Sequence, residues 1–158
     1  MRKLKTERQP EILDAAIAIA DEHGLDAVTM RAVADRIGLT PMAIYGYFRN
    51  KNELLDGIVG RVLSSLPQSP SWASWEERLN ALAWGIRGLA RDHPAVFGLL
   101  LARPSATPDG VWVVDQIYQA LLDAGVPDAD VPRVGRLIST FVLGFAAWEG
   151  NGRFTDSG

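Results

Sequence analysis

The sequence predicts an all-α protein, and three features indicate this fold class. Apolar residues recur at helical spacing, as in the series Trp75, Leu79, Leu82, Ile86 and Leu89. Residues that cap helix starts precede such segments, and glycines that close helix ends follow them. The chain has 158 residues, of which 47% are hydrophobic and 22% charged. This composition is typical of a globular protein that buries a core.

The first two helices are defined by their caps. Thr6 and Gln9 are spaced as a capping box for a helix that continues with apolar residues and ends at Gly24. Thr29 then precedes a short second helix, which Gly38 closes.

The third and fourth helices follow directly. Thr40 caps the third helix, and Pro41 takes its first helical position, where the missing N–H costs nothing. This helix is predicted to run to about Phe48. Asn50 and Glu53 then form a capping box that opens the fourth helix.

A linker separates these helices from the rest of the chain. Residues 64–74, SSLPQSPSWAS, are rich in Ser and Pro and carry no charge. After the linker, a capping box of Ser74 and Glu77 opens another helix. The helical segments predicted beyond the linker are about Trp75–Asp92, Ala95–Ala102, Asp109–Ala124 and Asp130–Glu149.

The charges divide the chain into the same two parts. Residues 1–61 hold nine Lys or Arg and nine Asp or Glu, whereas residues 62–158 hold seven and ten, which accounts for the net charge of −3. All three lysines lie in the first part and all five tryptophans in the second. This asymmetry predicts two domains with different tasks, residues 1–60 and residues 61–158.

Several classes of protein are not expected. The chain has no cysteine, so disulfide scaffolds and Cys-ligated metals are excluded, and a reducing cytoplasm is expected. The apolar, uncharged run from Leu137 to Trp148 has 12 residues, against the ~20 that span a bilayer. His23 and His93 each follow a predicted helix end, where a cation is favoured. We expect no enzyme, metal, cofactor or membrane association.

The turn between the second and third helices has the spacing of a helix-turn-helix. Ala34 lets two helices approach, Gly38 supplies a positive φ, and Ile44 fills the space between them. With Ile44 facing inward, Met42 and Tyr45 lie outside, where exposure is costly unless a partner covers them. The alternatives are a helical hairpin in some other bundle and ordinary half-buried packing of the tyrosines.

The segment GLDAVTMRAVADRIGLTPMAIYGYFRNKNELLDGIV, residues 24–59, resembles the DNA-binding domain of the tetracycline-repressor (TetR) family of bacterial regulators. The resemblance covers residues 6–60. It implies that the third helix enters the major groove, that Tyr47 and Lys51 bind phosphate, and that Arg31 reaches DNA. Gly46 departs from the family pattern and predicts a helix weakened by ~1 kcal/mol relative to alanine. The predicted DNA-binding residues are Thr29, Arg31, Thr40, Pro41, Met42, Tyr45, Tyr47 and Lys51.

The second domain is expected to sense a small molecule. The resemblance suggests a ligand cavity lined by aromatic residues, although aromatics at helical spacing are more often plain core. Arg87 lies one helical turn from Arg91 and beside Trp84, so that it could receive an acidic group, with a solvated face as the alternative. The predicted ligand-binding residues are Trp84, Arg87, Phe97, Trp112, Tyr118 and Phe141.

The last helices are predicted to form a homodimer. Their apolar stripes are more than one chain of this size is expected to cover, and the alternative is packing within the monomer. A two-fold contact would place two recognition helices ~34 Å apart, on successive major grooves. The predicted interface residues are Val114, Ile117, Leu121, Val134, Ile138, Phe141, Phe145 and Trp148.

Together these features predict a ligand-responsive repressor that binds a palindromic operator in double-stranded DNA as a homodimer and is released by a small-molecule effector. The alternative is a helical protein-interaction module without specific DNA binding. Salt-dependent binding to duplex DNA separates the two.

Overall fold

The computed structural model describes residues 5–103 and 107–150, with the side chains of residues 5–7 left aside. These residues form α-helices and one 3₁₀ turn and contain no strand, which confirms the all-α prediction. None of the described helices is both long and apolar enough to cross a membrane. The elements are α1 (Lys5–His23), η1 (Leu25–Ala27), α2 (Met30–Arg36), α3 (Pro41–Tyr45), α4 (Lys51–Leu63), α5 (Trp75–Asp92), α6 (Pro94–Ala102), α7 (Pro108–Asp123) and α8 (Val131–Gly150).

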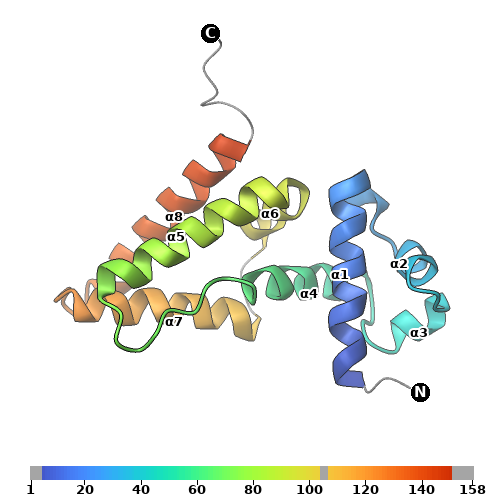
Figure 1. Cartoon of the computed structure of the whole chain (residues 1–158), viewed down its shortest axis with the longest axis horizontal. Helices are drawn as coiled ribbons and strands as arrows, with labels where there is room; N and C mark the ends of the chain where they lie inside the picture. Colours follow the sequence, from blue (N-terminus) through green and yellow to red (C-terminus); the bar gives the residue numbers. More distant parts are fainter. Residues whose placement is uncertain (1–4, 104–106, 151–158) are drawn as a thin grey trace, which may run out of the picture.

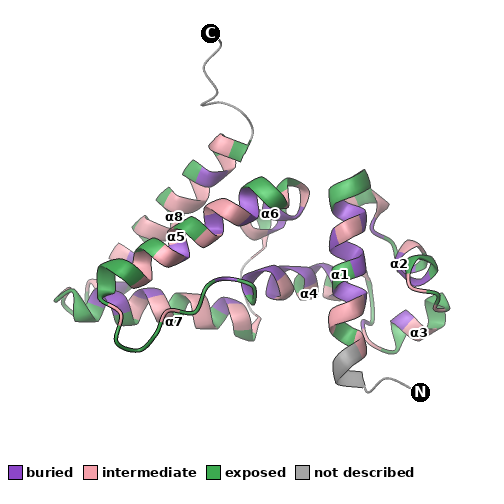
Figure 2. Cartoon of the chain, in the orientation of Figure 1, coloured by how far each residue is buried: buried purple, intermediate pink, exposed green. Residues whose placement is uncertain are grey.

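Helix α4 connects two groups of helices. Helices α2 and α3 lie on one side of α1, with α2 packed against α1 and α3 against α2, and α4 runs from α1 toward α5–α8 (Figure 1). Helix α4 packs against α1 of the first group and against α6 and α7 of the second. It is the most continuously buried helix in Figure 2, with Leu54 and Ile58 fully enclosed. A movement of α4 therefore affects both groups.

The predicted helix starts agree with the structure at most positions. The Oγ1 atoms of Thr29 and Thr107 accept hydrogen bonds from the N–H groups of Ala32 and Gly110, at 3.0 and 3.2 Å. Ser74 and Glu77 form the full reciprocal capping box. These side chains satisfy backbone donors that the first helical turn leaves free.

Three predicted helix ends are closed by glycine. Gly24 follows α1 with φ +82°, Gly38 follows α2 with φ +67° and Gly125 follows α7 with φ +84°. After Gly38, the N–H of Leu39 donates to the carbonyl of Ala34 at 2.9 Å. Because an L side chain rarely adopts this positive φ, glycine permits the sharp change of direction.

Three local predictions need correction. Helix α1 begins at Lys5, so Thr6 lies inside it and not at its cap. Helix α3 ends at Tyr45, not near Phe48, and Gly46 is its C-cap with φ −69°. The capping box of Asn50 and Glu53 is half formed. Oδ1 of Asn50 accepts from the N–H of Glu53 at 3.0 Å, but the Glu53 carboxylate accepts from the N–H of Arg49, at 2.6 Å, and not from that of Asn50.

Polar contacts hold the two helix groups together. The Arg103 guanidinium, directly after α6, donates to Oδ1 of Asp56 at 2.6 Å and to Oδ1 of Asn52 at 3.0 Å, both on α4. Between α5 and α6, His93 Nδ1 lies 2.7 Å from Oδ2 of Asp21 on α1. The first of these links joins the second helix group to the first turns of α4.

Candidate nucleic-acid interface and effector cavity

The orientation of α3 is fixed by what it buries. Ile44 is its only buried residue, and Phe48 just beyond the helix is buried as well. Both belong to one core with Val33 and Ala34 of α2. The Gly38 turn and this core hold α3 across α2, which is the arrangement of a helix-turn-helix.

The opposite side of α3 is open to solvent. Thr40, Pro41, Met42 and Tyr45 are all exposed, Met42 at 77% and Tyr45 at 49%. We call these four residues the reading face. The Thr40 hydroxyl also accepts from the N–H of Ala43 at 3.3 Å, so it caps the helix while lying at the surface. The major groove of B-DNA is about 12 Å wide and admits an α-helix.

Thr29 and Arg31 lie at the start of α2 and are exposed. The Oγ1 of Thr29 is engaged as the N-cap. The Arg31 side chain is 84% exposed, and its Nε lies 3.8 Å from Oδ2 of Asp35, one turn along. Such an exposed pair is worth little, so the guanidinium is available to a phosphate.

Tyr47 and Lys51 are less exposed to solvent than is expected of residues that bind phosphate. Tyr47 is partly buried and packs against the domain core. Lys51 is also partly buried, and its Nζ donates to the carbonyl of Leu25 at 3.4 Å. A phosphate contact by Lys51 therefore requires its ammonium group to turn away from Leu25 or to be shared with it.

The predicted set of DNA contacts leaves out Arg49. This side chain is 90% exposed, and its Nε lies 3.8 Å from Oε2 of Glu53. It stands immediately before Asn50, the N-cap of α4, where the helix dipole favours an anion. The basic triplet Arg49-Asn50-Lys51 is visible in the sequence, but only the structure shows which of its two cations is exposed.

A bidentate ion pair joins α2, the first helix of the helix-turn-helix, to α1. Nη1 of Arg36 on α2 donates to Oε2 of Glu22 on α1 at 2.7 Å, and its Nη2 donates to the other carboxylate oxygen. The hydrogen bond from Arg36 lowers the pKa of Glu22 below its ordinary value. The pair joins α2 to the end of α1.

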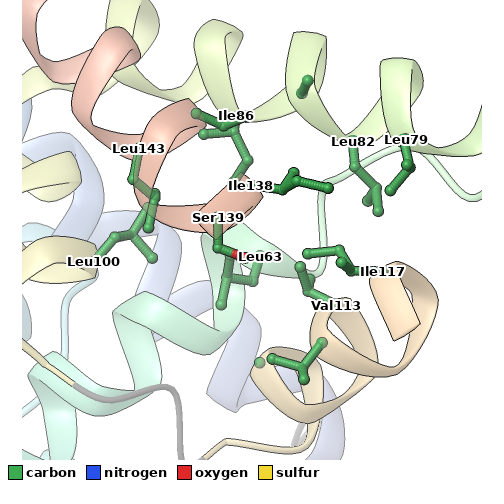
Figure 3. Close-up of a pocket in the computed structure, with 14 residues that line it drawn as sticks. Leu63, Leu79, Leu82, Ile86, Leu100, Val113, Ile117, Ile138, Ser139 and Leu143 are labelled. Carbon is green, nitrogen blue, oxygen red and sulfur yellow. The ribbon is translucent and has the colours of Figure 1, made fainter. Parts of the chain in front are cut away.

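A cavity of about 150 Å³ lies between the second group of helices and the end of α4. Its wall comes from α4, α5, α6, α7 and α8, and the side chains drawn in Figure 3 are almost entirely aliphatic. Leu63, the last residue of α4, forms part of this wall. The Ser139 hydroxyl supplies the polar group among the described lining residues.

None of the six predicted ligand-binding residues lines this cavity. Phe97 is buried in the core, and Trp112 and Tyr118 pack partly against it. Tyr118 fills the space beside Gly135, where an added Cβ would lie 2.8 Å from its ring. Phe141 points outward and is 73% exposed. Helical spacing places aromatics on a stripe, but the packing of five helices decides which stripe faces the cavity.

Trp84 and Arg87 lie together on the outside of α5. The guanidinium carbon of Arg87 sits 4.7 Å from the Trp84 ring centroid. Arg87 also forms a bidentate ion pair with Glu149 of α8, which lowers the pKa of that carboxyl below its ordinary value. These contacts join α5 to α8. Trp84 and Arg87 also line a second pocket of about 290 Å³, together with Arg91 and Glu149, so an anion site at this place stays a prediction.

The predicted dimer residues fall into two groups. Ile117 and Leu121 are buried within the chain, and Ile138 lines the cavity along with Ile117. Val134 is partly buried against the core. Val114 of α7 lines the cavity and is also 43% exposed. A larger exposed group lies on α8 and includes Leu137, which the prediction left out. It consists of Leu137, Phe141, Phe145 and Trp148, and we call it the α8 stripe.

Two family models match almost the whole chain. The model of bacterial regulatory proteins of the tetR family matches residues 12–58, and the tetracyclin repressor-like C-terminal domain matches residues 66–157. The chain belongs to the TetR family. Its fold confirms the resemblance found in the helix-turn-helix segment.

Relatives of this TetR-family chain are regulators. It is 30% identical to an HTH-type transcriptional regulator from Saccharopolyspora erythraea over 94% of this chain and 63% of that protein. It matches the HTH-type transcriptional repressor DrrR1 of Streptomyces coeruleorubidus at 30% identity over 85% of this chain and 51% of the relative. The chain thus spans about half to two thirds of the length of these curated relatives.

Two solved structures cover both helix groups. BioQ with its double-stranded DNA operator superposes with a TM-score of 0.76 and 31% identity, over 90% of this chain and 87% of BioQ. ActR from Streptomyces coelicolor, in complex with (S)-DNPA, gives a TM-score of 0.80 and 26% identity over 96% of this chain and 74% of ActR.

Proposed function

We propose that this TetR-family chain is a ligand-responsive repressor that binds a palindromic operator in double-stranded DNA and acts in the cytoplasm. The observation that carries the proposal is the reading face, where α3 exposes Met42 and Tyr45 while Ile44 anchors it from behind. The operator-bound BioQ and the repressor names of relatives support DNA binding, and no observation favours an interaction module or an enzyme.

The proposed DNA contacts divide into two kinds. The reading face contacts base edges and sugars in the major groove. Arg31, Arg49 and Lys51 contact phosphates, which fix the register of α3 without carrying sequence information. Thr29 and Tyr47 support these contacts from the start of α2 and from the segment after α3.

We place the boundary between the DNA-binding and sensing domains at residues 60 and 61, within α4. This helix has 13 residues and is therefore ~20 Å long. Its first turn lies beside the phosphate-binding residues, and Leu63 at its other end lines the cavity. An effector that favours a different position of Leu63 shifts the population toward a conformer with α3 misplaced for DNA.

We further propose that two copies associate through the α8 stripe. Phe141 and Phe145 are exposed, and their rings stack with centroids 6.2 Å apart. A second copy of the stripe would cover these side chains in a two-fold contact. Such a dimer sets two copies of α3 one DNA turn apart, ~34 Å, as a palindromic site requires.

Selection from a random pool of DNA duplexes tests this function. The proposal expects enrichment of a palindrome whose half-sites are roughly ten base pairs apart, centre to centre. The double variant Met42→Ala, Tyr45→Ala should enrich no common sequence. Failure of the wild-type protein to enrich any sequence would contradict specific DNA binding.

A further inference from the structure

The wall chemistry of the cavity restricts which molecules it can hold. Among the fourteen described residues that line it, none is charged and none is aromatic. The group includes leucine, isoleucine and valine side chains from five helices, with the Ser139 hydroxyl as its polar side-chain atom. An ionised ligand would lose its hydration here without a compensating partner, which is strongly unfavourable.

The size of the cavity adds a second restriction. Its volume of about 150 Å³ is close to that of an engineered apolar cavity that binds benzene. By this comparison it accommodates on the order of six to ten non-hydrogen atoms. Ser139 can donate or accept one hydrogen bond, because a hydroxyl has both capacities.

We propose that the effector of this protein is a small uncharged apolar molecule with a single hydroxyl or carbonyl group that pairs with Ser139. This inference rests on the proposed function, because it assigns the effector's chemistry and not only a cavity. The charged side chain of Arg87 lies outside this wall and lines a separate pocket with Trp84 and Glu149.

The position of the cavity gives such a ligand a route to the DNA-binding helices. Leu63 of α4 and Leu100 of α6 both line it. Three residues after Leu100, Arg103 holds Asn52 and Asp56 in the first turns of α4. A molecule wedged beside Leu63 and Leu100 therefore acts on α4 at both of its ends.

Three probes with six-membered rings test the charge preference in the full chain. We expect cyclohexanol to bind, as measured by calorimetry and by the shift in melting temperature, and cyclohexanecarboxylate to bind at least tenfold more weakly. Benzene should bind without forming a hydrogen bond to Ser139. Carboxylate binding as tight as that of cyclohexanol would overturn the proposal.

Variants with matched controls place the probe in the cavity. Val142→Phe fills the cavity and should weaken cyclohexanol binding at least tenfold, whereas Val111→Phe, on an exposed position of α7 outside the wall, should not. Ala83→Leu is a smaller filler to use if Val142→Phe loses helical circular dichroism. Ser139→Ala should weaken cyclohexanol several-fold and leave benzene unchanged, and Thr140→Ala should change neither. Unchanged binding by both filling variants would overturn the proposal.

Measuring DNA affinity with and without cyclohexanol distinguishes a wrong effector class from a wrong repressor function. With a selected duplex, cyclohexanol at ten times its Kd should lower DNA affinity at least threefold in the wild type and not in Val142→Phe. Binding of cyclohexanol without any change in DNA affinity would overturn its role as an effector. Absence of specific DNA binding, with the probe results intact, would refute the repressor function instead.

Discussion

Tyr45 projects from a helix of five residues in which Ile44 alone is buried. Its ring is half exposed, so it gains little from packing and is placed to contact a base or sugar. We predict that Tyr45→Ala weakens binding to a selected duplex by about 1–3 kcal/mol, in the range of a lost base or stacking contact. Fluorescence anisotropy measures this effect, with circular dichroism to verify the fold. Unchanged affinity in a folded variant would remove Tyr45 from the reading face.

Arg49 and Lys51 make a matched pair of cations at the start of α4. Arg49 is almost fully exposed, whereas Lys51 is bonded to the Leu25 carbonyl. We predict that Arg49→Ala lowers the slope of log affinity against log salt by about one unit, with sequence discrimination kept. Lys51→Ala should do the same if its ammonium leaves Leu25 on binding. A variant that loses discrimination but keeps its slope would contradict a phosphate role.

At the scale of elements, α7 and α8 approach each other at Gly135. A Cβ at this position would lie 2.8 Å from the Tyr118 ring, whereas one at Gly98 on α6 meets nothing within 4 Å. We predict that Gly135→Ala destabilises the fold by about 1 kcal/mol, since overpacking exceeds the gain in helix propensity. Gly98→Ala should stabilise it by about 0.5–1 kcal/mol. Urea unfolding measures both, and a stabilised Gly135→Ala would show that the two helices can separate freely there.

The α8 stripe is the proposed contact between two copies of the chain. Phe145→Glu would place a charge in the proposed contact between two copies, so we expect a folded monomer with little affinity for the operator. Arg136→Glu, on the same helix but off the stripe, should remain dimeric. Sedimentation at micromolar concentration is the measurement. A monomeric wild type, or a Phe145→Glu variant that is still dimeric and DNA-bound, would exclude this interface.

Helix starts were predictable because their signals are local. Thr29, Ser74 and Thr107 each bond to a backbone N–H three residues along, and nothing distant is needed. The cavity was not predictable in the same way. Ile117 has the periodicity of an interface residue, yet α5 and α8 cover it. Phe141 has a periodicity that fits both the cavity and the interface prediction, and it lies outside. Periodicity defines a face, and only tertiary packing decides what covers that face.

For the whole molecule, the ion pair between Arg87 and Glu149 makes the packing of α5 on α8 depend on pH. The hydrogen bond from Arg87 holds the pKa of Glu149 below its ordinary value of 4.5. A carboxyl whose pKa is lower in the folded state contributes stability above the unfolded value, and this contribution is lost as pH falls through the folded value. We predict that Glu149→Gln has a smaller unfolding free energy than the wild type at neutral pH, because the variant lacks the charged carboxylate that pairs with Arg87. The difference should shrink progressively below about pH 5. A gap that stays constant down to pH 2 would contradict the pairing.

Helix α4 links the proposed DNA-binding surface to the apolar cavity. Helix α4 begins beside Arg49 and ends at Leu63 in the cavity wall. It is buried along most of its length, so its ends are expected to move together rather than independently.

A salt titration tests whether this chain binds duplex DNA through the surface formed by α3 and the start of α4. Anisotropy of a selected duplex is measured from low to moderate salt. With Arg31, Arg49 and Lys51 of each copy contacting phosphates in a dimer, we predict a slope of log affinity against log salt of about −5 to −6. A mutated duplex should bind at least a hundredfold more weakly at the same salt. A slope near zero, or equal affinity for both duplexes, would contradict specific DNA binding by this surface.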